Sequence, residues 1–124
     1  MSQSTYKTFL VGVAFSPNLK PNLFEALRMA SLFGGRLVLV HVGEKTRSKE
    51  DELLQIIASF KEELPSYKVI WQSGSPVEVL LKNCVNHQAD LLILGAIQRE
   101  ALFTYYLGSV ARKLTRSAPC DVLL

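Results

Sequence analysis

Apolar residues along the chain follow two spacings, one typical of buried strands and one typical of helices. Short, nearly continuous apolar runs occupy residues 8–15 (TFLVGVAF), 37–42 (LVLVHV), 67–71 (YKVIW), 90–96 (DLLILGA) and 121–124 (DVLL). Runs of this length and composition are expected for strands that are covered on both faces. The pattern therefore predicts five buried strands.

The segments between these runs carry apolar residues three and four positions apart, as one face of a helix does. The first helix is expected after a turn at residues 18–21, and Gly34 and Gly35 are expected to end it. The second is expected to take Ser48 as its N-cap. Its expected buried stripe consists of Leu53, Ile56, Ile57, Phe60 and Leu64.

The start of the third helix has the clearest local signal in the chain. Ser75 is expected to cap it, Pro76 suits its first position, and Glu78 can close a capping box. Its expected apolar face consists of Leu80, Leu81, Cys84 and Val85. A fourth helix is expected over residues 109–117, immediately before the last strand.

Strands therefore alternate with helices from one end of the chain to the other. This alternation predicts an α/β fold in which helices cover both faces of a five-stranded, mostly parallel sheet. A length of 124 residues suits a single domain, over residues 1–124, with a core of its own. Because the sequence stops inside the last strand, the domain is also compatible with a piece of a longer chain.

Composition and charge exclude several classes of protein. Apolar residues make up 48% of the chain and charged residues 20%, as in ordinary soluble proteins. No apolar run approaches the length of a membrane span, and the first residues lack the apolar core of a signal peptide. A net charge of +3 is too small to indicate nucleic-acid binding. Cys84 and Cys120 lack metal-ligand spacing, so we expect reduced thiols and a cytoplasmic protein.

The stretch after the fourth strand has the pattern of an anion-binding pocket. The apolar strand residues that end at Leu94 lead directly into Gly95, and Gly108 and Ser109 then open the fourth helix. Glycine lets the backbone approach a ligand, and a helix N-terminus offers unpaired N–H groups and a partial positive charge. A ligand is therefore expected at the carboxyl ends of the strands.

An enzyme is not expected. The chain contains no Walker A loop, no G-x-S-x-G elbow and no H-E-x-x-H pair. His41 lies within an apolar strand, where a buried and hydrogen-bonded histidine is commoner than a catalytic one. A flavodoxin-like electron carrier would share this architecture, but the chain has no convincing flavin loop.

The order and spacing of these pieces resemble the universal stress protein domain over almost the whole chain. The matching segments are LVGVAFS at 10–16, EALRMA at 25–30, LVLVHV at 37–42, SGSPVEVLL at 73–81, ADLLILG at 89–95 and LGSVARKLTRSAPCDVLL at 107–124. The resemblance implies a Rossmann-like sheet with the strand order 3-2-1-4-5. It also implies a role in the stress response.

The resemblance further implies a nucleotide site with a glycine-rich pattern. Gly95, Gly108 and Ser109 fall at matching positions, whereas Gln98 stands where the family pattern has its second glycine. Ala14 stands where the first strand of the family usually ends in a nucleotide-binding Asp. The implied nucleotide-binding residues are Val42, whose backbone would meet the base, and Leu94, Gly95, Gln98, Gly108, Ser109 and Val110.

These two departures bear on the cofactor, for which ATP is the candidate. Without a carboxylate at Ala14 a charge-assisted hydrogen bond worth about 1.5–3 kcal/mol is lost. Gln98 places a side chain where bare backbone would otherwise approach phosphate. Together they predict ATP binding that is weaker by roughly two or three orders of magnitude, or absent. The alternative is a switch domain that retains ATP or AMP binding.

The resemblance also bears on partners. It implies a homodimer formed through the last strand, Asp121 to Leu124, and the short apolar edge of that strand suits such pairing. Relatives of this kind also occur as soluble appendages of membrane transporters, so a regulatory role beside a transporter is a second possibility. The apolar, aromatic loop 101–107 is expected to return to the core, to fill the nucleotide cavity or to meet a partner.

Overall fold

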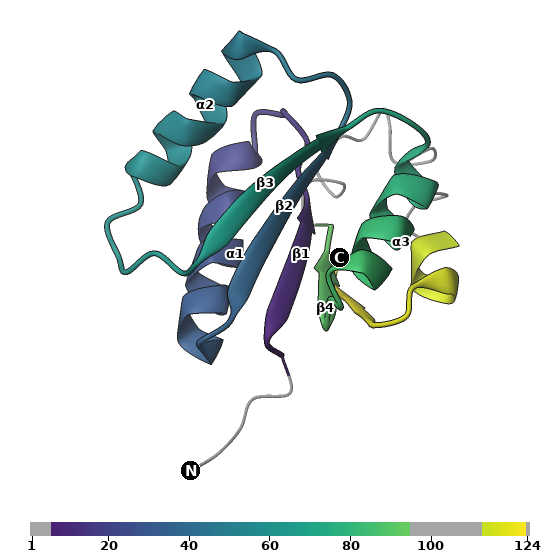
Figure 1. Ribbon diagram of the computed structural model, residues 1–124. Coiled ribbons are helices and arrows are strands. Elements are labelled where there is room, and N and C mark those ends of the chain that lie inside the picture. Colours follow the sequence, from purple (N-terminus) through teal and green to yellow (C-terminus); the bar gives the residue numbers. More distant parts are fainter. Residues whose placement is uncertain (1–5, 95–112, 124) are drawn as a thin grey trace.

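The computed structural model describes residues 6–94 and 113–123, and these residues form one parallel sheet with helices on both faces (Figure 1). The strands are β1 (Thr8–Gly12), β2 (Arg36–Val42), β3 (Tyr67–Gln72), β4 (Leu91–Ile93) and β5 (Asp121–Leu123). Their order is β3-β2-β1-β4-β5, and every neighbouring pair is parallel. The predicted fold class and strand order are confirmed.

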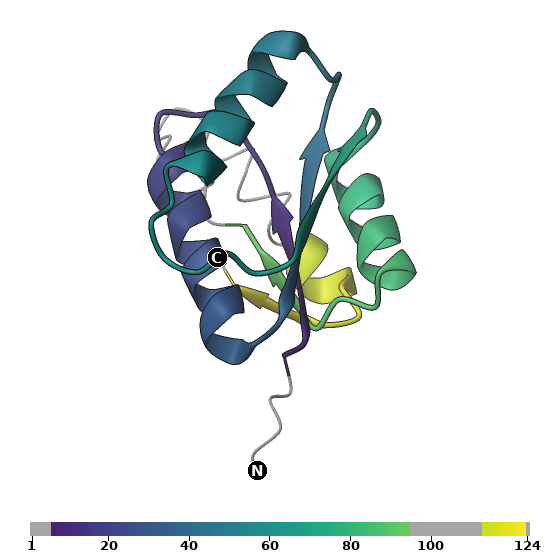
Figure 2. The ribbon, with the colours of Figure 1, turned by 60° about the vertical axis from the view of Figure 1, so that its left-hand side comes forward.

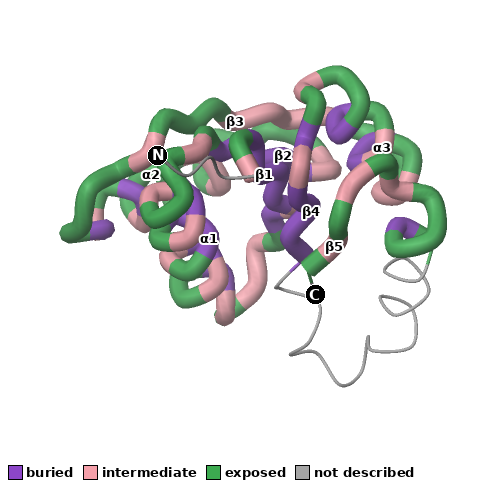
Figure 3. The backbone as a smooth tube through the Cα atoms, turned by 90° about the horizontal axis from the view of Figure 1, so that it is seen from below, coloured by how far each residue is buried: buried purple, intermediate pink, exposed green. Residues whose placement is uncertain are grey.

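Helices α1 (Leu19–Phe33) and α2 (Arg47–Ala58) cover one face of the sheet, while α3 (Pro76–Asn86) and the helical residues 113–117 cover the other (Figures 1 and 2). Successive side chains of a strand point to opposite faces, so each strand contributes to two cores. Phe9 and Val11 pack with α1 and α2, whereas Leu10 packs with α3. The buried residues follow the strands and the helix surfaces turned toward them (Figure 3).

Helix α1 begins earlier than expected. Its first residue is Leu19, with Asn18 as N-cap, so the predicted turn at 18–21 is wrong. Pro21 is tolerated because N–H groups in the first turn of a helix have no intrahelical partner. At the other end, Gly34 adopts a left-handed conformation with φ of 67°, and its N–H bonds to the carbonyl groups of Ala30 and Ser31. This is the expected role of glycine at a helix end.

Helix α2 is capped by Thr46 and not by Ser48. The Thr46 hydroxyl accepts a hydrogen bond from the Lys49 backbone N–H at 3.2 Å, and Ser48 lies inside the first turn. Because the helix ends at Ala58, Leu64 falls beyond it and is 43% exposed. The predicted stripe is therefore correct at Leu53 and Ile57, which are buried, and wrong at Leu64.

Helix α3 starts at Pro76 as predicted, with Ser75 as N-cap, but the Ser75 side chain makes no capping hydrogen bond. The predicted apolar face is wrong at Val85, which is 62% exposed. The inward position is taken by Asn83, whose Nδ2 donates to the Val79 carbonyl at 2.8 Å and to Gln72 Oε1 at 3.1 Å. These bonds satisfy a buried amide that hydrophobic spacing alone would not place in a core.

Candidate functional site

The chain changes its direction of travel across the sheet between β1 and β4, which lie side by side. From β1 it moves outward through β2 to β3, and it then crosses back to place β4 and β5 on the other side of β1. The helix that follows β1 covers one face, and the helical residues that follow β4 cover the other. Open α/β sheets bind ligands in the crevice at such a point, outside the carboxyl ends of the strands.

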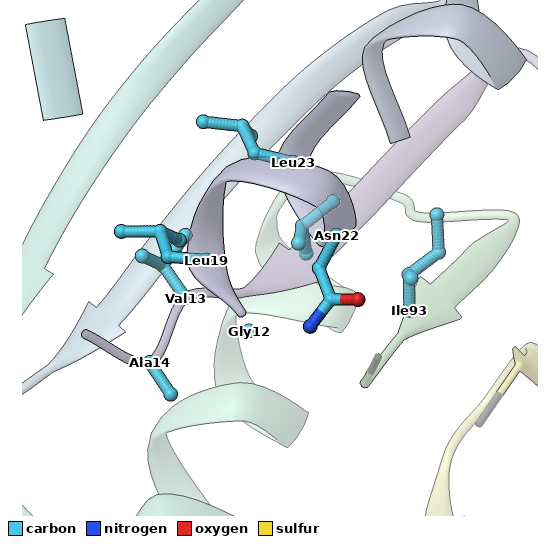
Figure 4. Close-up of a pocket in the computed structure, with 8 residues that line it drawn as sticks. Gly12, Val13, Ala14, Leu19, Asn22, Leu23 and Ile93 are labelled. Carbon is cyan, nitrogen blue, oxygen red and sulfur yellow. The ribbon is translucent and has the colours of Figure 1, made fainter. Parts of the chain in front are cut away.

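A pocket of about 20 Å³ lies at this point, against the first turns of α1 (Figure 4). Among the described residues it is lined by Val11, Gly12, Val13, Ala14, Leu19, Asn22, Leu23 and Ile93. A space of this size accommodates about one water-sized group. Its side chains are aliphatic except for Asn22, whose amide points into the space between Ala14 and Ile93 (Figure 4).

Ala14 lies on the rim of the crevice. Strand β1 ends at Gly12, earlier than the predicted residue 15, although the Val13 N–H still donates to the Val40 carbonyl at 2.8 Å. Beyond it the chain turns toward α1, and the Ser16 N–H donates to the Ala14 carbonyl. Ala14 is exposed and presents only a methyl group to the pocket. A longer side chain at this position would reach solvent or a ligand without displacing the core.

Two of the sequence-predicted site residues fall within the described part of the chain, on either side of the end of β1. Val42 ends β2 and is half-buried against the core under α3. Leu94 follows β4, is 4% exposed in the same core, and its N–H donates to the Leu123 carbonyl. The parallel topology therefore brings Val42, Ala14 and Leu94 together at the carboxyl ends of the strands.

The other predicted site residues lie outside the described residues. They are Gly95, Gln98, Gly108, Ser109 and Val110. The aromatic loop 101–107 also lies outside them, as does Leu124 at the end of the last predicted strand. Leu94 is thus the last described residue before the predicted glycine-rich loop.

The sequence interpretation missed an aromatic cluster near the carboxyl ends of the strands, formed by Phe15, His41 and Trp71. The rings of Phe15 and Trp71 are stacked with 6.0 Å between centroids, and both meet His41 edge-on. The register of β2 and β3 sets His41 directly opposite Trp71. The signal in the sequence is an aromatic ring near the end of each of two strands, His41 in β2 and Trp71 in β3. Only the register shows that these rings meet.

The hydrogen bonds of His41 assign its tautomer. Nδ1 lies 2.9 Å from the Val13 carbonyl oxygen, which can only accept, so Nδ1 carries the proton. Nε2 then accepts from the Lys49 ammonium group at 3.4 Å. Gly43 leaves room for this contact, because a Cβ there would lie only 2.8 Å from Nε2. Its φ of 154° also favours glycine. Both ring nitrogens are engaged, as predicted for a buried histidine.

The chemistry available elsewhere in the described residues is limited. No group of three or more His, Cys, Asp or Glu residues in 6–94 and 113–123 could hold a metal ion. Cys84 and Cys120 are free thiols. Burial, and after it the neighbouring Cys120, raises the pKa of Cys84 from 9.0 to about 12, so its reactive thiolate is scarce at neutral pH.

Solved structures of similar fold cover nearly the whole chain. A universal stress protein in complex with cAMP aligns with a TM-score of 0.77 at 22% identity, over 98% of this chain and 97% of its own. A universal stress protein from Lactobacillus plantarum aligns with a TM-score of 0.75 at 20% identity, over 98% of both chains. At these identities the likeness supports the fold.

Sequence comparison extends the likeness to the family level. A universal stress protein of Thermus aquaticus is 28% identical over 96% of this chain and 98% of its own length. A putative universal stress protein of Staphylococcus haemolyticus is 26% identical over 97% of this chain and 84% of its own. The model of the universal stress protein family matches residues 5–124. The resemblance seen in the sequence is thereby confirmed, and this chain belongs to the universal stress protein family.

Proposed function

We propose that this domain is a regulatory module of the stress response that acts through a protein partner, without catalysis, and binds nucleotide weakly or not at all. The observation that carries the proposal is Ala14, an exposed methyl group on the rim of the crevice between β1 and β4. A carboxylate at this position would accept a hydrogen bond from a sugar or base. Its loss costs about 1.5–3 kcal/mol of binding free energy, or about one to two orders of magnitude in affinity.

The alternative is a switch whose partner choice depends on ATP or AMP. It is supported by the position of the pocket, since the crevice at the β1–β4 junction is where α/β sheets bind nucleotides. It is also supported by the sequence after Leu94, where the predicted Gly95, Gly108 and Ser109 retain donors for phosphate. Because a universal stress protein of similar fold was solved with cAMP, cAMP belongs among the nucleotides to be tested.

Calorimetric titration with ATP and magnesium, AMP and cAMP separates these two functions. A dissociation constant tighter than about 10 μM would favour the switch and contradict the weak-binding proposal. Absence of heat at millimolar nucleotide would support the regulatory scaffold. Mass spectrometry of the denatured, freshly purified protein provides an independent check, because a switch of high affinity should retain nucleotide through purification.

We also propose that the protein forms a homodimer in the cytoplasm through the last strand. Strand β5 pairs on one side with β4 and lies at the edge of the sheet, with Leu123 40% exposed. An open strand edge presents backbone donors and acceptors that a second copy can pair. Within 6–94 and 113–123, no helix is both long and apolar enough to cross a bilayer. Sedimentation equilibrium at micromolar protein tests the dimer, and a monomeric mass would contradict it.

A further inference from the structure

The side-chain amide of Asn22 is a polar group in an otherwise apolar pocket. Its Nδ2 atom is buried and has no hydrogen-bond partner among the described residues. Asn22 lies on α1 between Leu19 and Leu23, both of which are buried, and all three line the pocket at the end of β1. Its amide points away from the helix and into the space between Ala14 and Ile93 (Figure 4).

An unpaired buried donor is unfavourable for folding. Leaving such a group without an acceptor costs about 1–3 kcal/mol, whereas an apolar side chain of the same size would carry no such penalty. The neighbouring positions of α1 show that leucine is well accommodated on this side of the helix. Polar groups that cost stability in the unliganded protein are typical of binding sites, where a ligand supplies the missing partner.

A buried water is a poor partner here. The pocket volume of about 20 Å³ would admit one water molecule, but buried waters typically make two to four hydrogen bonds. The side chains around the pocket are Val, Ala, Leu and Ile apart from Asn22 itself. A single acceptor atom at the edge of an aromatic base needs only the one donor that Asn22 offers, so it suits this wall better than water does.

We propose that Asn22 is a ligand-binding residue, and that its Nδ2 donates a hydrogen bond to an acceptor atom on the nucleoside part of an adenine nucleotide bound at the β1–β4 crevice. This inference rests on the nucleotide-binding part of the proposed function. It also changes the hydrogen bonding expected of the ligand. Beside Ala14 the pocket offers the Asn22 donor, whereas the Asp of the family pattern at position 14 would offer an acceptor. The amide then contributes one hydrogen bond to nucleotide binding.

Two ligand probes distinguish a nucleoside contact from a phosphate contact. ATP carries both parts, whereas inorganic tripolyphosphate carries only the anion. Asn22→Leu should weaken ATP binding by about tenfold, the size expected for one lost hydrogen bond, and leave tripolyphosphate binding within a factor of two. Asn86→Leu is the matched control, because Asn86 is exposed at the end of α3 and should change neither affinity.

Nuclear magnetic resonance gives a direct readout even where binding is weak. The side-chain amide signals of Asn22 are identified by their absence in Asn22→Leu. In the wild-type protein they should shift with millimolar ATP and stay in place with tripolyphosphate. The thermal midpoint of unliganded Asn22→Leu should equal or exceed that of the wild type, because the variant removes an unpaired buried donor.

Four results would contradict the proposed role of Asn22, and each identifies the premise that fails. A thermal midpoint lowered by several degrees in Asn22→Leu would show that the amide has a structural partner, and equal losses for ATP and tripolyphosphate would exclude a nucleoside contact. Unshifted Asn22 signals at millimolar ATP would also overturn the inference, while leaving the partner-binding module intact. Tight ATP binding that survives in Asn22→Leu would overturn both the inference and the weak-binding proposal, in favour of the switch.

Discussion

His41 Nδ1 donates a hydrogen bond to the Val13 carbonyl oxygen, 2.9 Å away, and so joins the end of β2 to the chain just beyond β1. This bond holds the backbone that leads to Ala14 and to the pocket. His41→Phe would keep an aromatic ring against Phe15 and Trp71 but leave the Val13 carbonyl without this donor. We expect a loss of about 1–3 kcal/mol in the free energy of unfolding, measured by urea denaturation.

Lys49→Met provides the control for His41→Phe. Lys49 contacts His41 Nε2 at 3.4 Å, a longer contact that leaves the Nδ1 bond in place when it is lost. We expect this variant to cost less than His41→Phe. If the two cost the same, the contact with Lys49 would be the important one, and the assigned role of the Val13 bond would be wrong.

Asp90 should stabilise the start of β1 through its carboxylate. Its Oδ2 atom accepts from the backbone N–H groups of Lys7 at 2.8 Å and Thr8 at 2.9 Å. Removing it in Asp90→Ala would leave both donors without this acceptor, so we expect destabilisation of about 1–3 kcal/mol in urea. Asp51→Ala is the control, because that carboxylate is exposed on α2, and its effect should stay within about 0.5 kcal/mol.

The buried thiol of Cys84 should make stability fall at alkaline pH. In the unfolded chain the thiol ionises near its ordinary pKa of 9.0, whereas burial keeps the folded form protonated up to about 12. The stabilisation is therefore complete below pH 9 and is lost progressively between pH 9 and 12.

The comparison with Cys84→Ala isolates this effect from the titration of tyrosines and lysines. The variant should be less stable near neutral pH, because it leaves a small cavity in the core. Its free energy of unfolding should nevertheless decline less steeply above pH 9 than that of the wild type. Identical slopes in the two proteins would show that the thiol does not carry the pH dependence.

The fold could be predicted because each strand is a short apolar run and each helix has an apolar face. Leu10 and Val11 are consecutive apolar residues that enter opposite cores, which is why the first strand reads as a continuous run. Helix ends were harder to predict. Thr46 and Ser48 are both capable N-caps, and only the extended backbone at Thr46 shows which one serves.

The residues of the candidate site that lie at strand ends could be predicted from the sequence. The residue that depends on how a helix packs, Asn22, could not. Val42, Ala14 and Leu94 each lie at or just beyond the end of an apolar run, so a parallel sheet must bring them to one edge. Asn22 lies between Pro21 and Leu23 in the sequence and three residues before the exposed Glu25, so its spacing alone suggests an outward-facing amide. Its burial depends on how α1 packs over β1 and β4, which no local pattern records.

The proposed dimer depends on the outward-facing backbone of Val122. The Leu123 carbonyl accepts from Leu94, so residue 123 faces β4 and the intervening Val122 presents its N–H and C=O groups to the open edge. Val122→Pro removes that outward donor without removing a bond to β4. We expect a monomer by sedimentation equilibrium with the circular dichroism of the wild type. A dimer that persists in this variant would place the interface elsewhere.

Placing the family's residues at positions 14 and 98 tests the proposal that Ala14 and Gln98 weaken nucleotide binding. In Ala14→Asp the new carboxylate would stand on the exposed rim of the pocket and accept a hydrogen bond from the nucleoside. In Gln98→Gly the loop would regain bare backbone for phosphate. We expect the double variant to bind ATP about a hundredfold or more tightly than the wild type in calorimetry, because two lost contacts return.

The single variants Ala14→Asp and Gln98→Gly show how much each substitution contributes to the gain in ATP affinity. Because Ala14 is exposed, Ala14→Asp should leave the free energy of unfolding almost unchanged, so any gain in affinity reflects the site and not the fold. Tripolyphosphate should respond to Gln98→Gly and not to Ala14→Asp, since the family pattern assigns position 98 to the phosphate and position 14 to the nucleoside. An unchanged titration in the double variant would mean that the crevice is closed to nucleotide by something other than these two residues.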